Sequence, residues 1–148
     1  MARNKFSLTS SAAVALTAAT EKTVVQLNAG AAICSVVAVD LTFDGTSNSA
    51  VPVVCKLITV STAGTGSARN PLKLTDRATA LIATGTENHS AEGTNANILK
   101  IMHIHPQAGV VYPFPITSEI EVPGSGRLAV KVTAPAGVNC LCTLVGEE

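Results

Sequence analysis

The chain has 148 residues, and ten Lys or Arg side chains balance ten Asp or Glu, so its formal net charge is zero. A neutral chain with no cluster of basic and aromatic residues lacks the field that attracts phosphate groups, which excludes nucleic acid as a partner. No apolar stretch reaches the roughly 18 residues that a membrane-spanning helix needs, so no membrane partner is expected either.

The composition also constrains the core and the surface. Apolar residues make up 47% of the chain and aromatic residues only 3%, so we expect a core of Val, Ala, Leu and Ile. Charged residues make up 14%, whereas a typical soluble domain has about 25%. Two alternatives fit such a surface: partial coverage by copies of itself or by another protein, or an uncovered β surface rich in Thr and Ser. The length suits one domain.

The first twenty residues differ from the rest. Residues 1–20 are rich in Ser, Ala and Thr, with Phe6 and Leu8 as isolated large apolar side chains. Two arrangements fit this segment: an edge strand of its own domain, or an arm that lies on a neighbouring subunit. Its Ala-rich run faintly imitates a signal peptide, but Ser and Thr dilute that run, so we expect it to stay uncleaved.

Residues 21–148 are expected to form one β-sandwich domain. Runs rich in Val, Ile and Thr recur between Gly, Pro, Asn and Asp, which is typical of strands. They predict strands at 23–28, 33–43, 52–60, 80–84, 98–105, 118–122, 127–133 and 138–145. Short strands with crossover connections favour an all-β, single-domain, two-sheet sandwich that is jelly-roll-like, with an extended N-terminal segment. An immunoglobulin-like sandwich is the alternative, which the absence of Trp weakens.

The segments between these strands are read as connections. Asp44-Gly45 predicts a tight turn that the polar residues 46–49 extend. Residues 61–70 and 86–97 are polar and predict surface loops. Residues 106–115 include two prolines that cannot donate to a strand ladder, so they predict a crossover or an edge strand. Residues 71–83 are ambiguous, because their Leu spacing permits a helical turn or two while their Thr residues lower helix propensity.

The clearest strand signal lies at the C-terminal end, in residues 127–148. Leu128, Val130 and Val132 alternate with other residues, the sequence APAG interrupts the chain at 134–137, and a second alternating run follows. Period-two alternation predicts a closing β-hairpin or strand pair. The second run carries Cys140 and Cys142 on one strand face.

None of the four cysteines has CxxC spacing, and we expect them to be reduced thiols buried as small hydrophobic groups. An inter-strand disulfide from Cys34 or Cys55 to Cys140 is the alternative.

His103 and His105 form the one arrangement that could bind a metal ion. Histidines two apart on a strand share a face, and imidazole is a ligand for zinc, copper, iron or nickel. A cupin site would need a Glu three or four residues after His105 and a later His, but Ala108 and Gly109 stand there and no His follows. Serine nucleophiles, catalytic carboxylate pairs and phosphate loops also lack their sequence context. We therefore predict no metal, no cofactor and no enzymatic activity.

Three stretches carry a resemblance to a known family. They are LTFDGTS at 41–47, HPQAG at 105–109, and GRLAV at 126–130 running on through TAPAGVN at 133–139 to the Glu-Glu end. Together they resemble small jelly-roll proteins of tailed bacteriophages, the capsid decoration (cement) proteins, from about Phe43 onward.

The resemblance implies a non-enzymatic structural protein of the virion. It implies a homotrimer on the outer surface of a phage capsid, where it binds the major capsid protein and stabilises the shell. Tyr112 and Phe114 are candidate interface plugs. The resemblance does not reach residues 1–20, and from the residues alone Phe6 and Leu8 are candidate arm anchors. Ordinary packing within the chain is the alternative for all four.

Two other functions are kept as alternatives. One is a host- or glycan-binding surface module, which the scarcity of aromatic side chains for stacking on sugar rings disfavours. The other is a self-assembling subunit of a tube or surface layer, which would form linear polymers where a decoration protein forms closed trimers.

Overall fold

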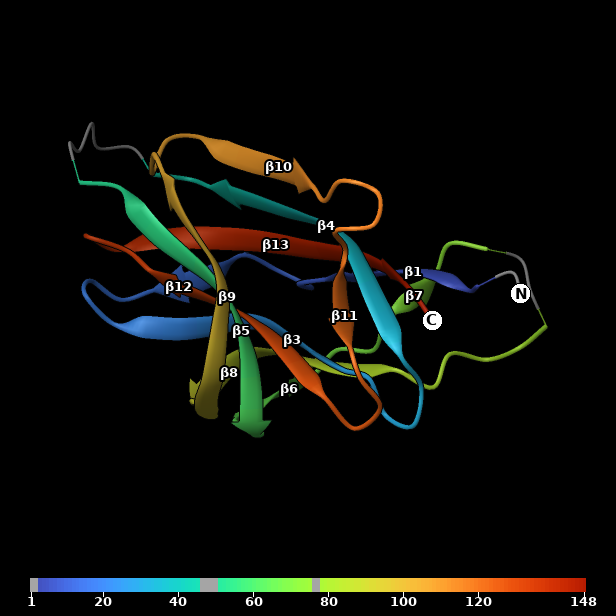
Figure 1. Ribbon diagram of the computed structural model, residues 1–148. Helices are drawn as coiled ribbons and strands as arrows, with labels where there is room; N and C mark the ends of the chain where they lie inside the picture. Colours follow the sequence, from blue (N-terminus) through green and yellow to red (C-terminus); the bar gives the residue numbers. More distant parts are fainter. Residues whose placement is uncertain (1–2, 46–50, 76–77) are drawn as a thin grey trace.

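A computed structural model describes residues 3–45, 51–75 and 78–148 of the chain (Figure 1). These residues form β-strands joined by turns and loops, and none of them lies in a helix. Two antiparallel sheets pack face to face, which confirms the predicted all-β, two-sheet, jelly-roll-like sandwich. Within the described ranges, no helix of the length and apolar character needed to cross a membrane occurs.

The seven-stranded sheet is the upper layer of Figure 1. Its strand order is β10-β4-β13-β1-β7, while β11 also pairs with β4 and β2 with β13. The strands are β1 (Lys5–Thr9), β2 (Val14–Leu16), β4 (Cys34–Phe43), β7 (Leu72–Lys73), β10 (Gly109–Pro113), β11 (Ile120–Val122) and β13 (Val138–Glu147).

The six-stranded sheet is the lower layer, with the order β6-β8-β3-β12-β5-β9. Its strands are β3 (Glu21–Asn28), β5 (Val53–Thr62), β6 (Thr65–Ala68), β8 (Thr84–Ala91), β9 (Thr94–Ile104) and β12 (Arg127–Thr133). Consecutive strands β3, β4 and β5 alternate between the two sheets, so each chain crossing ties one layer to the other.

The core lies between the sheets and is aliphatic, as the composition predicts. Alternate residues of the central strands face inward, for example Leu128, Val130 and Val132 of β12 against Leu41 and Leu144 of the opposite sheet. All four cysteines are buried and free, in agreement with the expected reduced thiols.

The predicted closing hairpin at the C-terminal end is wrong. β12 pairs with β3 and β5, whereas β13 pairs with β4, β1 and β2 in the other sheet. Residues 134–137 therefore carry the chain across the sandwich, and Ala134 is held by a parallel bridge to Ala18. Alternation along each run identifies a strand, but it does not specify the partner of that strand.

Two further expectations fail in the segment before β9. Residues 80–83 of the predicted strand at 80–84 lie outside any strand, because β8 begins at Thr84. The predicted loop at 86–97 instead contains most of β8, a tight turn at Glu92 and Gly93, and the start of β9. The inward positions of β8 are Gly85, Glu87 and His89, so its buried face shows no apolar alternation.

Among the other predicted connections, one prediction is confirmed and two are corrected. Residues 109–113 form β10 at the edge of the seven-stranded sheet, which confirms the edge-strand alternative for 106–115. The expected loop at 61–70 contains β6, and 71–83 contains β7 and no helical turn over its described residues. The expected extension of the Asp44-Gly45 turn over 46–49 lies outside the described residues.

Candidate protein interface

Two edge strands meet along one flank of the sandwich. β9 is the last strand of the six-stranded sheet, and β10 is the last strand of the seven-stranded sheet (Figure 1). They come together at one point, where the Nζ atom of Lys100 in β9 sits 3.9 Å from the centroid of the Tyr112 ring in β10. We call these two strands, with the loop 114–119 that follows them, the β9–β10 flank.

Exposed apolar side chains occur along the β9–β10 flank, on either side of the edge where the two sheets meet. They are Ile98, Leu99 and Ile101 of β9, Val111 of β10 and Ile116 of the loop. Val111 is 72% exposed and Ile116 is 87% exposed, so these side chains gain nothing from the core of their own chain. Long edge strands with apolar side chains offer unpaired backbone groups to another chain, and such patches mark interfaces. β9 is eleven residues long, which makes its free edge extensive.

Tyr112 and Phe114 lie at the inner side of this flank. Their ring centroids are 5.3 Å apart at an interplanar angle of 71°, an edge-to-face contact. Both are half-buried and pack against the core, yet each keeps some exposed surface. Both rings therefore connect the flank to the core of the chain. Their role as interface plugs stays a prediction.

Phe6 and Leu8 do not lie at any surface. Both side chains are 0% exposed and belong to the core, and β1 pairs with β13 over its whole length. The prediction that they anchor an arm on a neighbouring subunit is therefore wrong, because no part of either side chain is free to contact one. Of the two arrangements considered for residues 1–20, β1 adopts the strand within its own domain.

The His103–His105 arrangement lies at the end of β9 with both side chains exposed. The Nδ1 atom of His105 accepts a hydrogen bond from the backbone N–H of Gln107 at 3.2 Å, which caps the turn that follows. Within the described part of the chain, no group of three or more His, Cys, Asp or Glu side chains is close enough to hold a metal ion.

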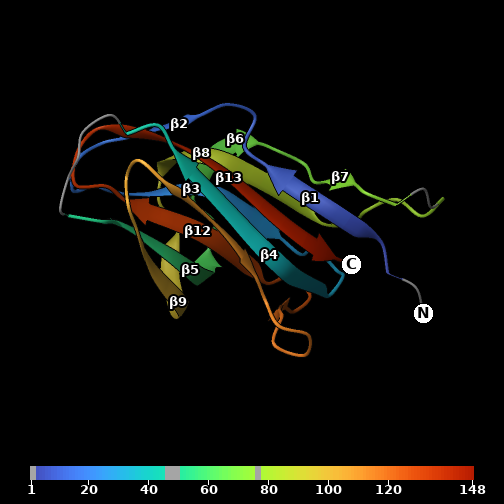
Figure 2. The ribbon, with the colours of Figure 1, turned by 90° about the horizontal axis from the view of Figure 1, so that it is seen from above.

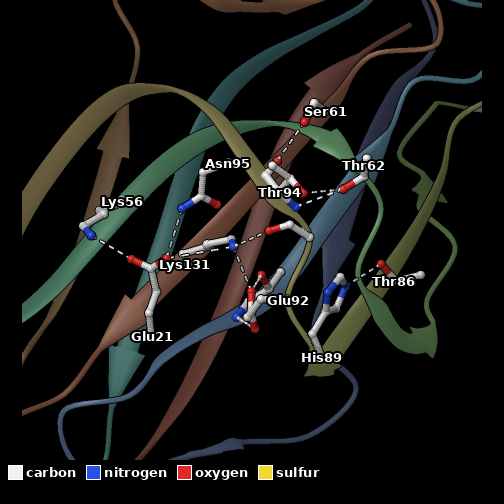
Figure 3. Close-up of polar contacts among 12 residues, drawn as sticks. Glu21, Lys56, Ser61, Thr62, Thr86, His89, Glu92, Thr94, Asn95 and Lys131 are labelled. Atoms are coloured by element: carbon white, nitrogen blue, oxygen red, sulfur yellow. Dashed lines mark hydrogen bonds and ion pairs between the residues drawn. The ribbon is translucent and has the colours of Figure 1, made fainter.

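A cluster of charged residues around the buried Lys131 fixes the turn that leads into β9 (Figure 3). Lys131 of β12 is 2% exposed, although its position in the alternating run predicts an outward side chain. Its Nζ atom lies 2.9 Å from Glu92 Oε2 and 3.9 Å from Glu21 Oε1, and it donates to the carbonyl oxygen of Gly93 at 3.3 Å. The turn between β8 and β9 therefore covers Lys131 and is held in place by it.

Both carboxylates of this cluster are stabilised in their charged form. Burial alone would raise the pKa of Glu92, but hydrogen bonds from Thr23 and the contact with Lys131 outweigh it and hold that pKa below 4.5. Burial likewise opposes a low pKa at Glu21, where Lys56, at 2.7 Å, and Asn95 hold the pKa of the carboxyl down. The cluster is a structural clamp, since every one of its charges is paired within the chain.

His89 lies beside the clamp and is 3% exposed. Its Nε2 atom is 2.8 Å from the Thr86 hydroxyl, and burial lowers the pKa of the ring, which favours the neutral form. The ring fits against Gly64 and Gly66, where an added Cβ would come within 2.6 Å and 2.3 Å of it. These glycines lie in the stretch 61–70 that the sequence predicts as a surface loop, and their lack of a side chain makes room for the imidazole of His89.

No protein-family model, no curated protein and no solved structure matched this chain. The β9–β10 flank is therefore interpreted from its own geometry and from the residues that form it.

Proposed function

We propose that this protein is a non-enzymatic structural protein of a phage virion, which binds the outside of the capsid and stabilises the shell as a homotrimer. The observation that carries the proposal is the β9–β10 flank, where two edge strands and the loop that follows β10 carry five exposed apolar side chains. The scarcity of charged residues, 14% of the chain, also supports a surface that is covered in the assembled state.

The flank suits a ring of identical subunits. A closed cyclic trimer uses a heterologous contact, in which each subunit presents one surface to the next. A specific interface needs about 800 Å² from each partner, and a flank formed by two strands and a loop can supply an area of that order. The rigid clamp at the start of β9 reduces the conformational entropy lost when that edge is ordered on association.

Shell stabilisation follows from such a trimer by mass action. A ligand that binds the intact shell more tightly than the ruptured shell stabilises it by RT ln(1 + [L]/Kd), about 2.7 kcal/mol at a hundredfold excess over Kd. No bond is made or broken in this activity.

The trimer is tested by changing the flank without changing the core. Ile101 faces Lys56 across the ladder, so Ile101→Glu places an opposite charge there and preserves the strand pairing. We expect the wild-type protein to have three times the mass of the 15.0 kDa chain in sedimentation analysis, and I101E to associate at least about tenfold more weakly.

Ile33→Glu is the matched control, because Ile33 is 55% exposed, close to the 52% of Ile101, and precedes β4 outside the flank. I33E should remain trimeric. A monomeric wild-type protein, or equal effects of the two substitutions, would contradict the proposed flank interface. Open linear polymers would instead favour the tube or surface-layer alternative.

Shell binding is tested on capsids that lack this protein, purified from the phage that encodes it. Wild-type protein should co-sediment with these capsids and raise the temperature at which they release DNA. A protein that forms trimers but leaves both the sedimentation and the release temperature unchanged would refute the capsid role while leaving the trimer intact.

A further inference from the structure

The outer face of the seven-stranded sheet is a second surface with an unusual composition. Figure 2 looks onto this face, where β4, β13 and β1 run side by side. Residues paired across an antiparallel ladder point to the same side, so the register identifies the members of the face. They are Val111, Asp40, Thr143 and Thr9 in one row, Pro113, Ala38, Val145, Ser7 and Leu72 in the next, and Gly109, Thr42 and Leu141 in a third.

These rows contain small, apolar or hydroxyl side chains and one ionisable group, the carboxylate of Asp40. Val111, Leu72 and Leu141 are large apolar side chains on this face that remain exposed. Lys5 and Glu147 lie opposite each other at one end of the sheet, beyond these rows. The middle of the face is thus nearly neutral, with one negative charge placed between Val111 and Thr143.

Asp40 has no partner for one of its oxygens. Its Oδ1 atom is buried and accepts no hydrogen bond, and the neighbouring Thr143 hydroxyl donates to Thr9 at 3.1 Å. Burial raises the pKa of the Asp40 carboxyl, so the free chain disfavours the charge that this residue carries at neutral pH. By contrast, Asp44 at the end of the same strand is fully satisfied by the backbone and side chain of Asn139, each at 2.7 Å.

We propose that this face docks on a protein surface of the shell that presents a Lys or Arg side chain to Asp40. The inference rests on the proposed capsid role and names the surface and the chemistry of that contact. A cation beside the part of the Asp40 carboxylate that reaches the surface would offset its charge, while Val111 and Leu141 on the neighbouring strands would contact apolar atoms next to it. Val111 belongs to the β9–β10 flank as well, so the docking face and the trimer flank are continuous at β10.

A second copy of the same face is a poorer occupant. Two such faces packed about a two-fold axis through their middle would bring two Asp40 carboxylates toward each other, and like charges disfavour that contact. The proposed trimer contact through the flank would cover this face only at its β10 edge, where Val111 lies. Charge complementarity therefore points to a different protein with a basic group.

The test compares Asp40→Asn with Glu121→Gln, which makes the same change in net charge at an exposed position of β11, outside the β9–β10 flank and outside the three rows of this face. Binding to capsids that lack this protein is measured at low and high salt, together with the melting temperature and the mass of each free variant. We expect D40N to melt no lower than the wild type, to remain trimeric, and to bind with a Kd at least about tenfold higher and a weaker salt dependence. E121Q should bind within about twofold of the wild type.

The outcomes separate the two proposals. If wild-type protein does not bind the capsids, the capsid role itself fails and this inference falls with it. If wild-type protein binds and D40N binds equally well, the capsid role stands and the Asp40 contact is refuted. If D40N changes the mass of the free protein, Asp40 belongs to a self-contact, and the assignment of this face to the shell is wrong.

Discussion

At the scale of single residues, Lys131 departs furthest from what its sequence position predicts. It stands in an alternating run where Leu128, Val130 and Val132 face the core, so its own side chain is expected in solvent. It is buried because the turn after β8 folds over it and supplies Glu92. The partners come from residues that are distant in sequence, so no local pattern could indicate them.

Removing one partner of Lys131 should destabilise the fold. Breaking a buried ion pair costs about 3–5 kcal/mol, while exposed pairs contribute less than about 1 kcal/mol. Because the Glu92 side chain keeps 32% of its surface exposed, we expect Glu92→Gln to cost roughly 2 kcal/mol of unfolding free energy, between those limits. Urea denaturation at pH 7 measures the loss.

The pH dependence of stability in acid should also reveal the contact between Glu92 and Lys131. The folded-state pKa of Glu92 lies below 4.5, so its contribution is complete above that pH and is lost as the pH falls further. E92Q should therefore lose less stability than the wild type between pH 5 and pH 3. Lys131→Met, which removes the buried charge with its need for a partner, should cost less than E92Q. Equal stability of E92Q and wild type at pH 7 would show that the contact contributes nothing.

At the scale of the elements, β8 shows why some strands escape sequence reasoning. Its inward residues include Glu87 and His89, which are satisfied by polar partners: Ser11 bonds Glu87, and Thr86 bonds His89. Hydropathy alternation detects strands through burial of apolar groups, so a strand with a polar inward face resembles a loop. The apolar strands β4, β5, β12 and β13 were predictable for the same physical reason.

The glycines beside His89 provide a test at this scale. A Cβ at Gly66 would come 2.3 Å from the His89 ring and 2.7 Å from the Glu87 carbonyl oxygen, so Gly66→Ala requires the pairing of β6 with β8 to shift. We expect G66A to lower the unfolding free energy by about 1–3 kcal/mol, as overpacking does. Thermal or urea denaturation measures this change.

Gly137→Ala is the matched substitution in open space, since the nearest atom to its added Cβ is the Leu16 carbonyl oxygen at 3.9 Å. G137A should be neutral, or stabilising by less than about 1 kcal/mol through the unfolded chain. Equal stability of G66A and G137A would contradict the tight contact between Gly66 and the His89 ring.

At the scale of the whole molecule, the burial of the four cysteine thiols shows that the two sheets enclose a core from which solvent is excluded. Cys34, Cys140 and Cys142 come from the seven-stranded sheet and Cys55 from the six-stranded one, and all four are buried. Burial raises the pKa of Cys34 to about 11 and of Cys55 to about 12, and it raises those of the other two thiols as well. The interior therefore favours neutral thiols over thiolates.

These thiols predict a loss of stability in alkali. A raised folded-state pKa contributes stability that is complete below the unfolded value of 9.0 and is lost as the pH rises above it. We expect the unfolding free energy to fall between pH 9 and pH 11, and the native protein at pH 8 to react with a thiol reagent only as fast as it opens. Rapid labelling of all four thiols in the native state would contradict a closed interior.

The sequence by itself determined what each segment does locally. Apolar alternation identified most strands, the aliphatic core and the buried thiols, because these depend on the side-chain period of a single strand. Only the tertiary structure decided which strands pair, and it placed β12 and β13 in opposite sheets, buried Lys131, and drew Phe6 and Leu8 into the core. It also brought Lys100 of β9 against Tyr112 of β10 and left the Oδ1 atom of Asp40 without a hydrogen-bond partner. Pairing and burial depend on contacts between distant segments, and a periodic pattern carries no information about the partner across the ladder.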